Sequence, residues 1–145
     1  MKFPKEFLNG CIIFVSTGAF FFLMNAVGLG HLFYLRLINV FFVFYGVNRT
    51  IKMNLAEGEK NFVPNSVAAL LTSIVGVFLS ITGLIIYSYL KGGDSYVQSL
   101  SETFLFGGNP SIFTYSISLL FEGIASSVIV TMLLMLYWNN RLTSD

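Results

Sequence analysis

Two residues of opposite charge lie inside long apolar stretches of the sequence. Arg36 is part of the run YLRLINVFF (34–42), and Glu122 is part of the apolar run 112–138. A charge at the centre of a bilayer costs about 2.5–3.5 kcal/mol on insertion scales, so such residues are usually paired or functional. The chemistry open to them is mutual neutralisation, or the binding of an ion, a proton or a polar solute.

Mutual neutralisation requires that both charges lie at a similar depth. At about 1.5 Å per residue, Arg36 lies roughly 10 Å and Glu122 roughly 15 Å from the outer end of its helix. The length of an arginine side chain spans this difference. We therefore predict an intramembrane ion pair that fixes how the second helix packs against the fourth.

Polar neighbours extend this predicted pair into a cluster. Asn39 follows Arg36 by three residues, and Ser118 and Ser126 flank Glu122 by four residues on either side. Their side chains offer the hydrogen bonds that a single ion pair leaves open. The full predicted intramembrane polar cluster is Arg36, Asn39, Glu122, Ser118, Ser126, Asn25 and His31.

Two alternatives to a structural ion pair are open. In the first, Arg36 extends toward the outer headgroups and leaves Glu122 hydrogen-bonded or protonated. In the second, the two residues belong to a site for a substrate, an ion or a proton. The sequence predicts no enzyme, metal or cofactor, because His31 and Cys11 are single and no phosphate loop or nucleophile elbow is present.

The elements that must position these residues are transmembrane helices. Of 145 residues, 55% are hydrophobic and only 10% are charged, whereas soluble domains carry about 25% charged residues. Four apolar runs (7–27, 29–47, 66–90 and 112–138) have the length of about 20 residues that a bilayer core requires. The predicted fold is a single all-α integral membrane domain (1–145), a bundle of four transmembrane helices.

The basic residues predict the orientation of this bundle. Lys2, Lys5, Arg49, Lys52, Lys60 and Arg141 flank one side of the four runs, and Lys91 flanks the other. Because lysine and arginine are enriched in cytoplasmic segments, both termini are expected in the cytoplasm. The loop 48–65 is then cytoplasmic and the loop 91–111 is external. A net charge of +1 gives no general attraction for nucleic acid.

Both loops are expected to contain helical residues. The second helix should continue to about Ala56, Gly58 should end it, and Asn65 should cap the third helix. In the outer loop, Val97, Leu100 and Phe104 share a face. They predict a short amphipathic helix on the outer surface, with a simple packed loop as the alternative.

Small residues predict where the helices pack. A seam in the third run has steps of four and three residues, the spacing of one helix face. This helix-packing seam is Ala69, Ser73, Gly76, Ser80 and Gly83. Its hydroxyls could also line a polar pathway. The phenylalanine runs 20–22 and 41–42 are expected to face lipid or a partner protein.

Two stretches carry a family resemblance. HLFYLRLINVFFVFYGVNRTIK and FVPNSVAALLTSIVGVFLSITGLIIYSYL resemble a family of small four-span inner-membrane proteins of Bacteroidetes that has no assigned activity. The resemblance implies a bacterial cytoplasmic (inner) membrane location. We expect a non-enzymatic accessory or assembly subunit of a larger membrane complex, or a homo-oligomer. The alternative is a small oligomeric carrier or channel with a polar site at Arg36 and Glu122.

Overall fold

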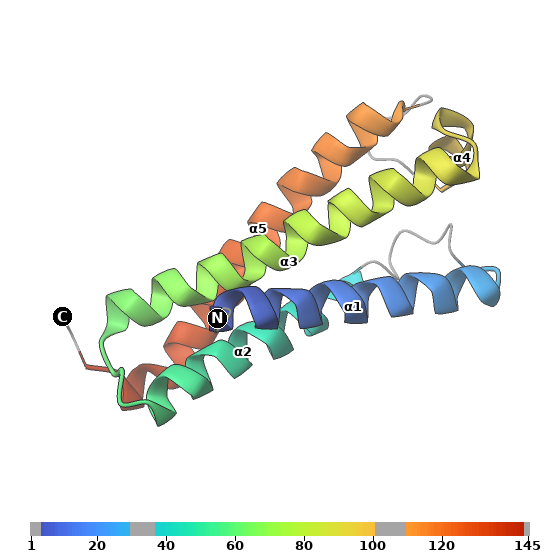
Figure 1. Ribbon diagram of the computed structural model, residues 1–145. Helices are drawn as coiled ribbons and strands as arrows, with labels where there is room; N and C mark the ends of the chain where they lie inside the picture. Colours follow the sequence, from blue (N-terminus) through green and yellow to red (C-terminus); the bar gives the residue numbers. More distant parts are fainter. Residues whose placement is uncertain (1–3, 30–36, 101–109, 144–145) are drawn as a thin grey trace.

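The structure, a computed structural model, describes residues 4–29, 37–100 and 110–143. These ranges consist of helices and the turns between them, with one isolated β-bridge (Figure 1). The helices are α1 (Lys5–Ala26), α2 (Asn39–Ala56), α3 (Phe62–Lys91), α4 (Asp94–Leu100), α5 (Ile112–Trp138) and a short 3-10 helix (Asn139–Arg141). The predicted all-α fold class is confirmed for the described residues.

Three helices within the described residues are long and apolar enough to cross a membrane. They are α1, α3 and the segment Ile112–Arg141 that contains α5. Although α2 has 18 residues, it is not among them because its second half carries Asn48, Arg49 and Lys52. The predicted second span (29–47) overlaps α2 from Asn39 onward, and residues 30–36 lie outside the described residues.

Glycine accounts for the ends of two helices. α2 ends at Ala56, as the sequence predicts, and Gly58 follows with a φ of 90°. α3 ends at Lys91, and Gly92 follows with a φ of 129°. Side chains with a Cβ rarely adopt such angles, so glycine allows the chain to turn at both places.

The prediction that Asn65 caps the third helix is wrong. α3 begins earlier, at Phe62, and Asn65 is fully buried within its first turns. The Asn65 side chain donates hydrogen bonds to the carbonyl oxygens of Glu59 (3.1 Å) and Asn61 (2.8 Å). It therefore holds the preceding loop from inside the helix.

The helix α3 lies at the centre of the arrangement and contacts α1, α2, α4 and α5. At its beginning, the Thr143 N–H donates to the carbonyl oxygen of Lys60 (2.8 Å), which ties the end of the chain to the loop before α3. The helices α1, α2, α3 and α5 converge near this end (Figure 1), and the packed core lies there. Its buried residues are Ile13, Val43, Val47, Ile51, Ala69, Val130, Leu134, Met135 and Trp138.

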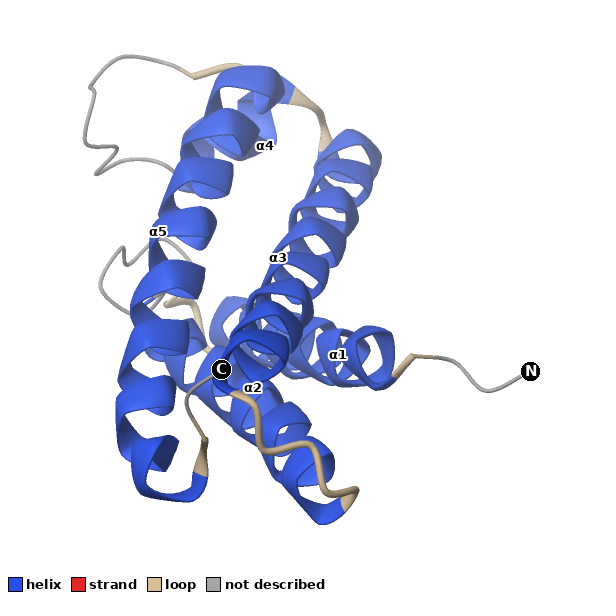
Figure 2. Ribbon diagram, turned by 90° about the vertical axis from the view of Figure 1, so that its left-hand side faces the viewer, coloured by secondary structure: helices blue, strands red, loops and turns tan. Residues whose placement is uncertain are grey.

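The short helix α4 lies at the opposite end, between the ends of α3 and α5 (Figure 2). Its Val97 is only 1% exposed and packs with Ile112 and Tyr115 of α5. The Asp94 carboxylate accepts a hydrogen bond from the Ile112 N–H (2.9 Å), which satisfies a free donor at the start of α5. The predicted short helix is thus present, and Val97 faces other helices. A position on the membrane surface stays a prediction, and Phe104 lies outside the described residues.

Candidate functional site

The structure describes five of the seven residues of the predicted intramembrane polar cluster. Arg36 and His31 lie outside the described residues, so the ion pair between Arg36 and Glu122 stays a prediction. Asn39 is the first residue of α2, and Glu122 lies in the middle of α5. Asn25, near the end of α1, donates to the Tyr96 hydroxyl of α4 (3.4 Å).

A cavity of about 430 Å³ opens between α1, α2, α3 and α5. Three members of the predicted cluster line it: Asn39, Glu122 and Ser126. Ser118 is not part of the lining and donates to the Thr114 carbonyl oxygen of its own helix (3.2 Å). The polar side chains of the lining are Thr17, Asn39, Ser80, Tyr87, Tyr115, Glu122 and Ser126.

Two polar groups of this lining have no described partner. Glu122 is the only charged side chain among the described lining residues. The only ion pair between described residues joins Lys5 and Glu57, at the other end of the bundle. The Asn39 Oδ1 atom is buried and accepts no hydrogen bond from the described residues. A buried acceptor without a partner costs about 1–3 kcal/mol, so the Asn39 Oδ1 atom is available to a bound molecule. Glu122 is exposed, so its carboxylate can be reached by a molecule that enters the cavity.

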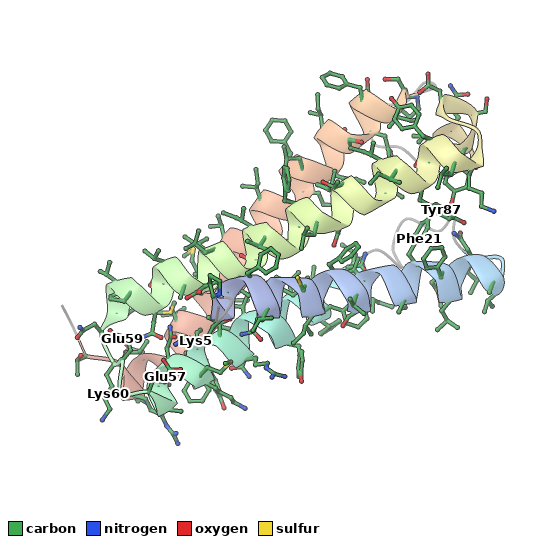
Figure 3. All side chains as sticks on the ribbon, viewed as in Figure 1. Lys5, Phe21, Glu57, Glu59, Lys60 and Tyr87 are labelled. Carbon is green, nitrogen blue, oxygen red and sulfur yellow. The ribbon has the colours of Figure 1, made fainter. Side chains whose placement is uncertain are left out.

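An aromatic cluster, defined as Phe21, Phe22, Tyr87 and Tyr96, lies at the α4 end of the cavity. Its ring centroids are 5.8 Å apart for Phe21 and Tyr87, 5.2 Å for Phe22 and Tyr87, and 5.6 Å for Tyr87 and Tyr96. Figure 3 shows Phe21 of α1 facing Tyr87 of α3. Burial raises the pKa of the Tyr96 hydroxyl. Phe21 and Phe22 line the cavity. Phe22 is also 54% exposed and Phe41 is 69% exposed, which agrees with the expectation that these phenylalanine runs face lipid or a partner.

At the other end, the helices pack too closely to leave a cavity. Ile13 of α1 lies between Gly46 of α2 and Gly76 of α3. A Cβ added to Gly46 would lie 2.7 Å from the Ile13 Cδ1 atom, and one added to Gly76 would lie 2.8 Å from the Ile13 Cβ atom. Only residues without a side chain permit this approach. The core therefore closes one end of the cavity.

The predicted helix-packing seam divides between these two environments. Ala69 and Ser73 are fully buried and Gly76 contacts Ile13, so the first part of the seam lies in the packed half. Ser80 and Gly83 line the cavity. The same face of α3 therefore serves helix packing at one end and the cavity wall at the other.

A buried polar network near the packed end was not predicted. The Asn9 amide donates to the Thr50 hydroxyl (2.8 Å), and the hydroxyls of Thr50 and Thr72 are also 2.8 Å apart. Lys5 donates to the Asn54 side chain (2.7 Å), and the Asn54 amide donates to the Asn65 oxygen (3.2 Å). Figure 3 shows Lys5 near Glu57, to which it also binds (2.5 Å).

Residue spacing could have revealed this network. Lys5 and Asn9 on α1, and Thr50 and Asn54 on α2, are four residues apart. Side chains at this spacing lie on one face of a helix, so two helices with such pairs can align them. The spacing alone leaves open which faces meet.

The described residues contain no group of three histidine, cysteine or acidic side chains that could hold a metal ion. The site's chemistry is thus that of a carboxylate, an amide and several hydroxyls in an otherwise apolar and aromatic cavity. Comparisons of the chain with protein-family models, with curated proteins and with solved structures give no match.

Proposed function

We propose that the protein is a non-enzymatic integral membrane protein that binds a small molecule within the bilayer, in the cavity between α1, α2, α3 and α5. One observation carries this proposal: Glu122 and the unpartnered Asn39 Oδ1 lie in the lining of one mostly apolar cavity. Its volume of about 430 Å³ falls within the roughly 300–1,000 Å³ that is typical of small-molecule sites.

The closure of the cavity at one end supports a carrier role. Carriers hold a solute near the middle of the membrane and expose it to one side at a time. Here the packed core around Ile13 and the Asn9–Thr50–Thr72 hydrogen bonds lie on the closed side. Glu122 lies about 15 Å along α5 from Ile112, the depth at which a carrier would hold its solute.

We further propose four spans, with both termini in the cytoplasm of a bacterial cell and the bundle in its cytoplasmic membrane. Support comes from the three apolar helices together with the run 29–47. Three basic residues, Lys5, Lys60 and Arg141, lie at the end of the bundle where α1 begins and α5 ends. Lys91 lies at the opposite end, next to α4. This asymmetry follows the positive-inside rule.

Native mass spectrometry of the protein extracted gently from its own membranes tests the binding proposal. Gly18 lines the cavity, and an added Cβ there meets no atom within 4 Å. Gly18→Leu should fold normally but fill the cavity. Ala19→Leu is the matched control, because Ala19 is exposed and not part of the lining.

The wild-type protein and the Ala19→Leu variant are expected to carry a non-covalent small-molecule adduct that Gly18→Leu lacks. Identical spectra for all three proteins would refute the proposal. The expected role as an accessory subunit stays a prediction, and the same spectra test it. A second protein chain at fixed stoichiometry would support that role.

A further inference from the structure

We infer that the ligand of this cavity is a small organic cation with an apolar body, a protonated amine or a quaternary ammonium, held by the carboxylate of Glu122. The inference rests on the proposed function, because it names the class of molecule that the cavity binds. The proposed ligand carries a positive charge, and Glu122 is the group that selects it.

The positive charge of the ligand is inferred from the charged side chains that line the cavity. Glu122 has no described partner of opposite charge, and no described lysine or arginine lines the cavity. Lys91 lies over the Tyr87 ring (5.7 Å to its centroid) and is not part of the lining. A carboxylate beside a mostly apolar cavity attracts a cation more strongly than the same carboxylate surrounded by water.

The apolar body follows from the other side chains. Five aromatic rings line the cavity with aliphatic residues between them, and these rings are Phe14, Phe21, Phe22, Tyr87 and Tyr115. The faces of such rings attract ammonium groups, and quaternary ammonium ligands are recognised in this way. A simple metal cation would find a single carboxylate and no other ligand set among the described residues. An organic cation matches both the negative charge of Glu122 and the apolar, aromatic lining of the cavity.

Asn39 adds a preference among organic cations. Its buried Oδ1 is an acceptor without a described donor, and a protonated amine has N–H groups to offer. Asn39 begins α2 and Glu122 lies on α5, so a bound amine could engage two different helices.

A matched pair of compounds tests the inference. Benzyltrimethylammonium carries a permanent charge, and neopentylbenzene is its neutral analogue with carbon in place of nitrogen. Binding of radiolabelled benzyltrimethylammonium is measured by equilibrium dialysis against the full-length protein in lipid nanodiscs, with empty nanodiscs as the blank. Neopentylbenzene serves as the competitor.

The cation should bind wild-type protein, and the neutral analogue should compete about tenfold more weakly or worse. Glu122→Gln should weaken cation binding by about tenfold or more, because it removes the negatively charged partner of the ligand. Glu6→Gln is the control, since it removes a carboxylate at the far end of α1 and should leave binding unchanged. Gly18→Leu, which keeps the carboxylate, should also abolish binding.

Three outcomes would overturn the inference. Equal competition by the neutral analogue, with no effect of Glu122→Gln, would mean that the cavity binds apolar molecules without regard to charge, and the proposed function would stand. Cation binding that occurs only after Arg36→Gln would mean that the chain's own arginine neutralises Glu122. Failure of both compounds to bind wild type and Arg36→Gln, with no native adduct, would remove the proposed function as well.

Discussion

Replacing Thr50 with valine should destabilise the protein by about 1–3 kcal/mol. Thr50 accepts a hydrogen bond from the Asn9 amide and lies 2.8 Å from the Thr72 hydroxyl. Either hydroxyl can be the donor between Thr50 and Thr72, because Thr72 also lies 2.8 Å from the Ala68 carbonyl oxygen and Thr50 lies 3.3 Å from the Gly46 carbonyl oxygen. Valine loses both bonds between helices, each worth about 0.5–1.5 kcal/mol. The Asn9 amide keeps only a long contact to the Met53 sulfur (3.5 Å).

The assay is reversible unfolding in mixed micelles with increasing SDS, followed by circular dichroism. Thr82→Val is the matched control, because Thr82 is exposed on α3 and bonds to the Phe78 carbonyl oxygen of its own helix (2.9 Å). Its effect should stay within about 0.5 kcal/mol. The double variant Asn9→Leu with Thr50→Val should cost about 1 kcal/mol less than the two single variants together, since no donor is then left unpaired.

Two results would refute this reasoning. If Thr50→Val and Thr82→Val have the same effect, the buried bonds contribute nothing beyond a surface threonine. If the costs of Asn9→Leu and Thr50→Val simply add, the two side chains do not interact in the membrane-embedded protein.

Two further predictions follow from the packing and from the charges. Gly76→Ala should destabilise by about 1–3 kcal/mol, because its Cβ would lie 2.8 Å from the Ile13 Cβ atom. Gly18→Ala, with no atom within 4 Å of its Cβ, should be neutral or stabilising by up to about 1 kcal/mol; equal effects of the two in SDS unfolding would contradict the described packing. Two single-cysteine variants, made without the native cysteine, test the orientation with a membrane-impermeant maleimide. Glu59→Cys should react from the cytoplasmic side and Ser95→Cys from the outside. Labelling of both variants from the same side would disprove the four-span orientation.

Much of the helix arrangement could be predicted from local sequence. The end of α2 at Ala56 and the turn at Gly58 agree with the sequence because both depend on neighbouring residues. The predicted start of α3 is wrong because Asn65 resembles a cap in the sequence, yet its side chain is buried and accepts a hydrogen bond from Asn54, which belongs to another helix.

The candidate site was predictable only in part. Glu122 and Asn39 were recognised because polar groups in apolar runs are conspicuous. That they line one cavity, together with Phe21 and Phe22, depends on how far α1, α3 and α5 stand apart at the α4 end. This separation is a property of packing between helices, which hydropathy and spacing do not describe.

The sequence by itself determined that the chain forms apolar helices suited to a bilayer, because transfer from water depends on residue type summed over about 20 positions. It also determined which polar groups are costly to bury. Only the tertiary structure decided which of these groups meet. Ile13 fits between two glycines at one end while the other end stays open beside Glu122, since close packing joins residues that are far apart in the chain.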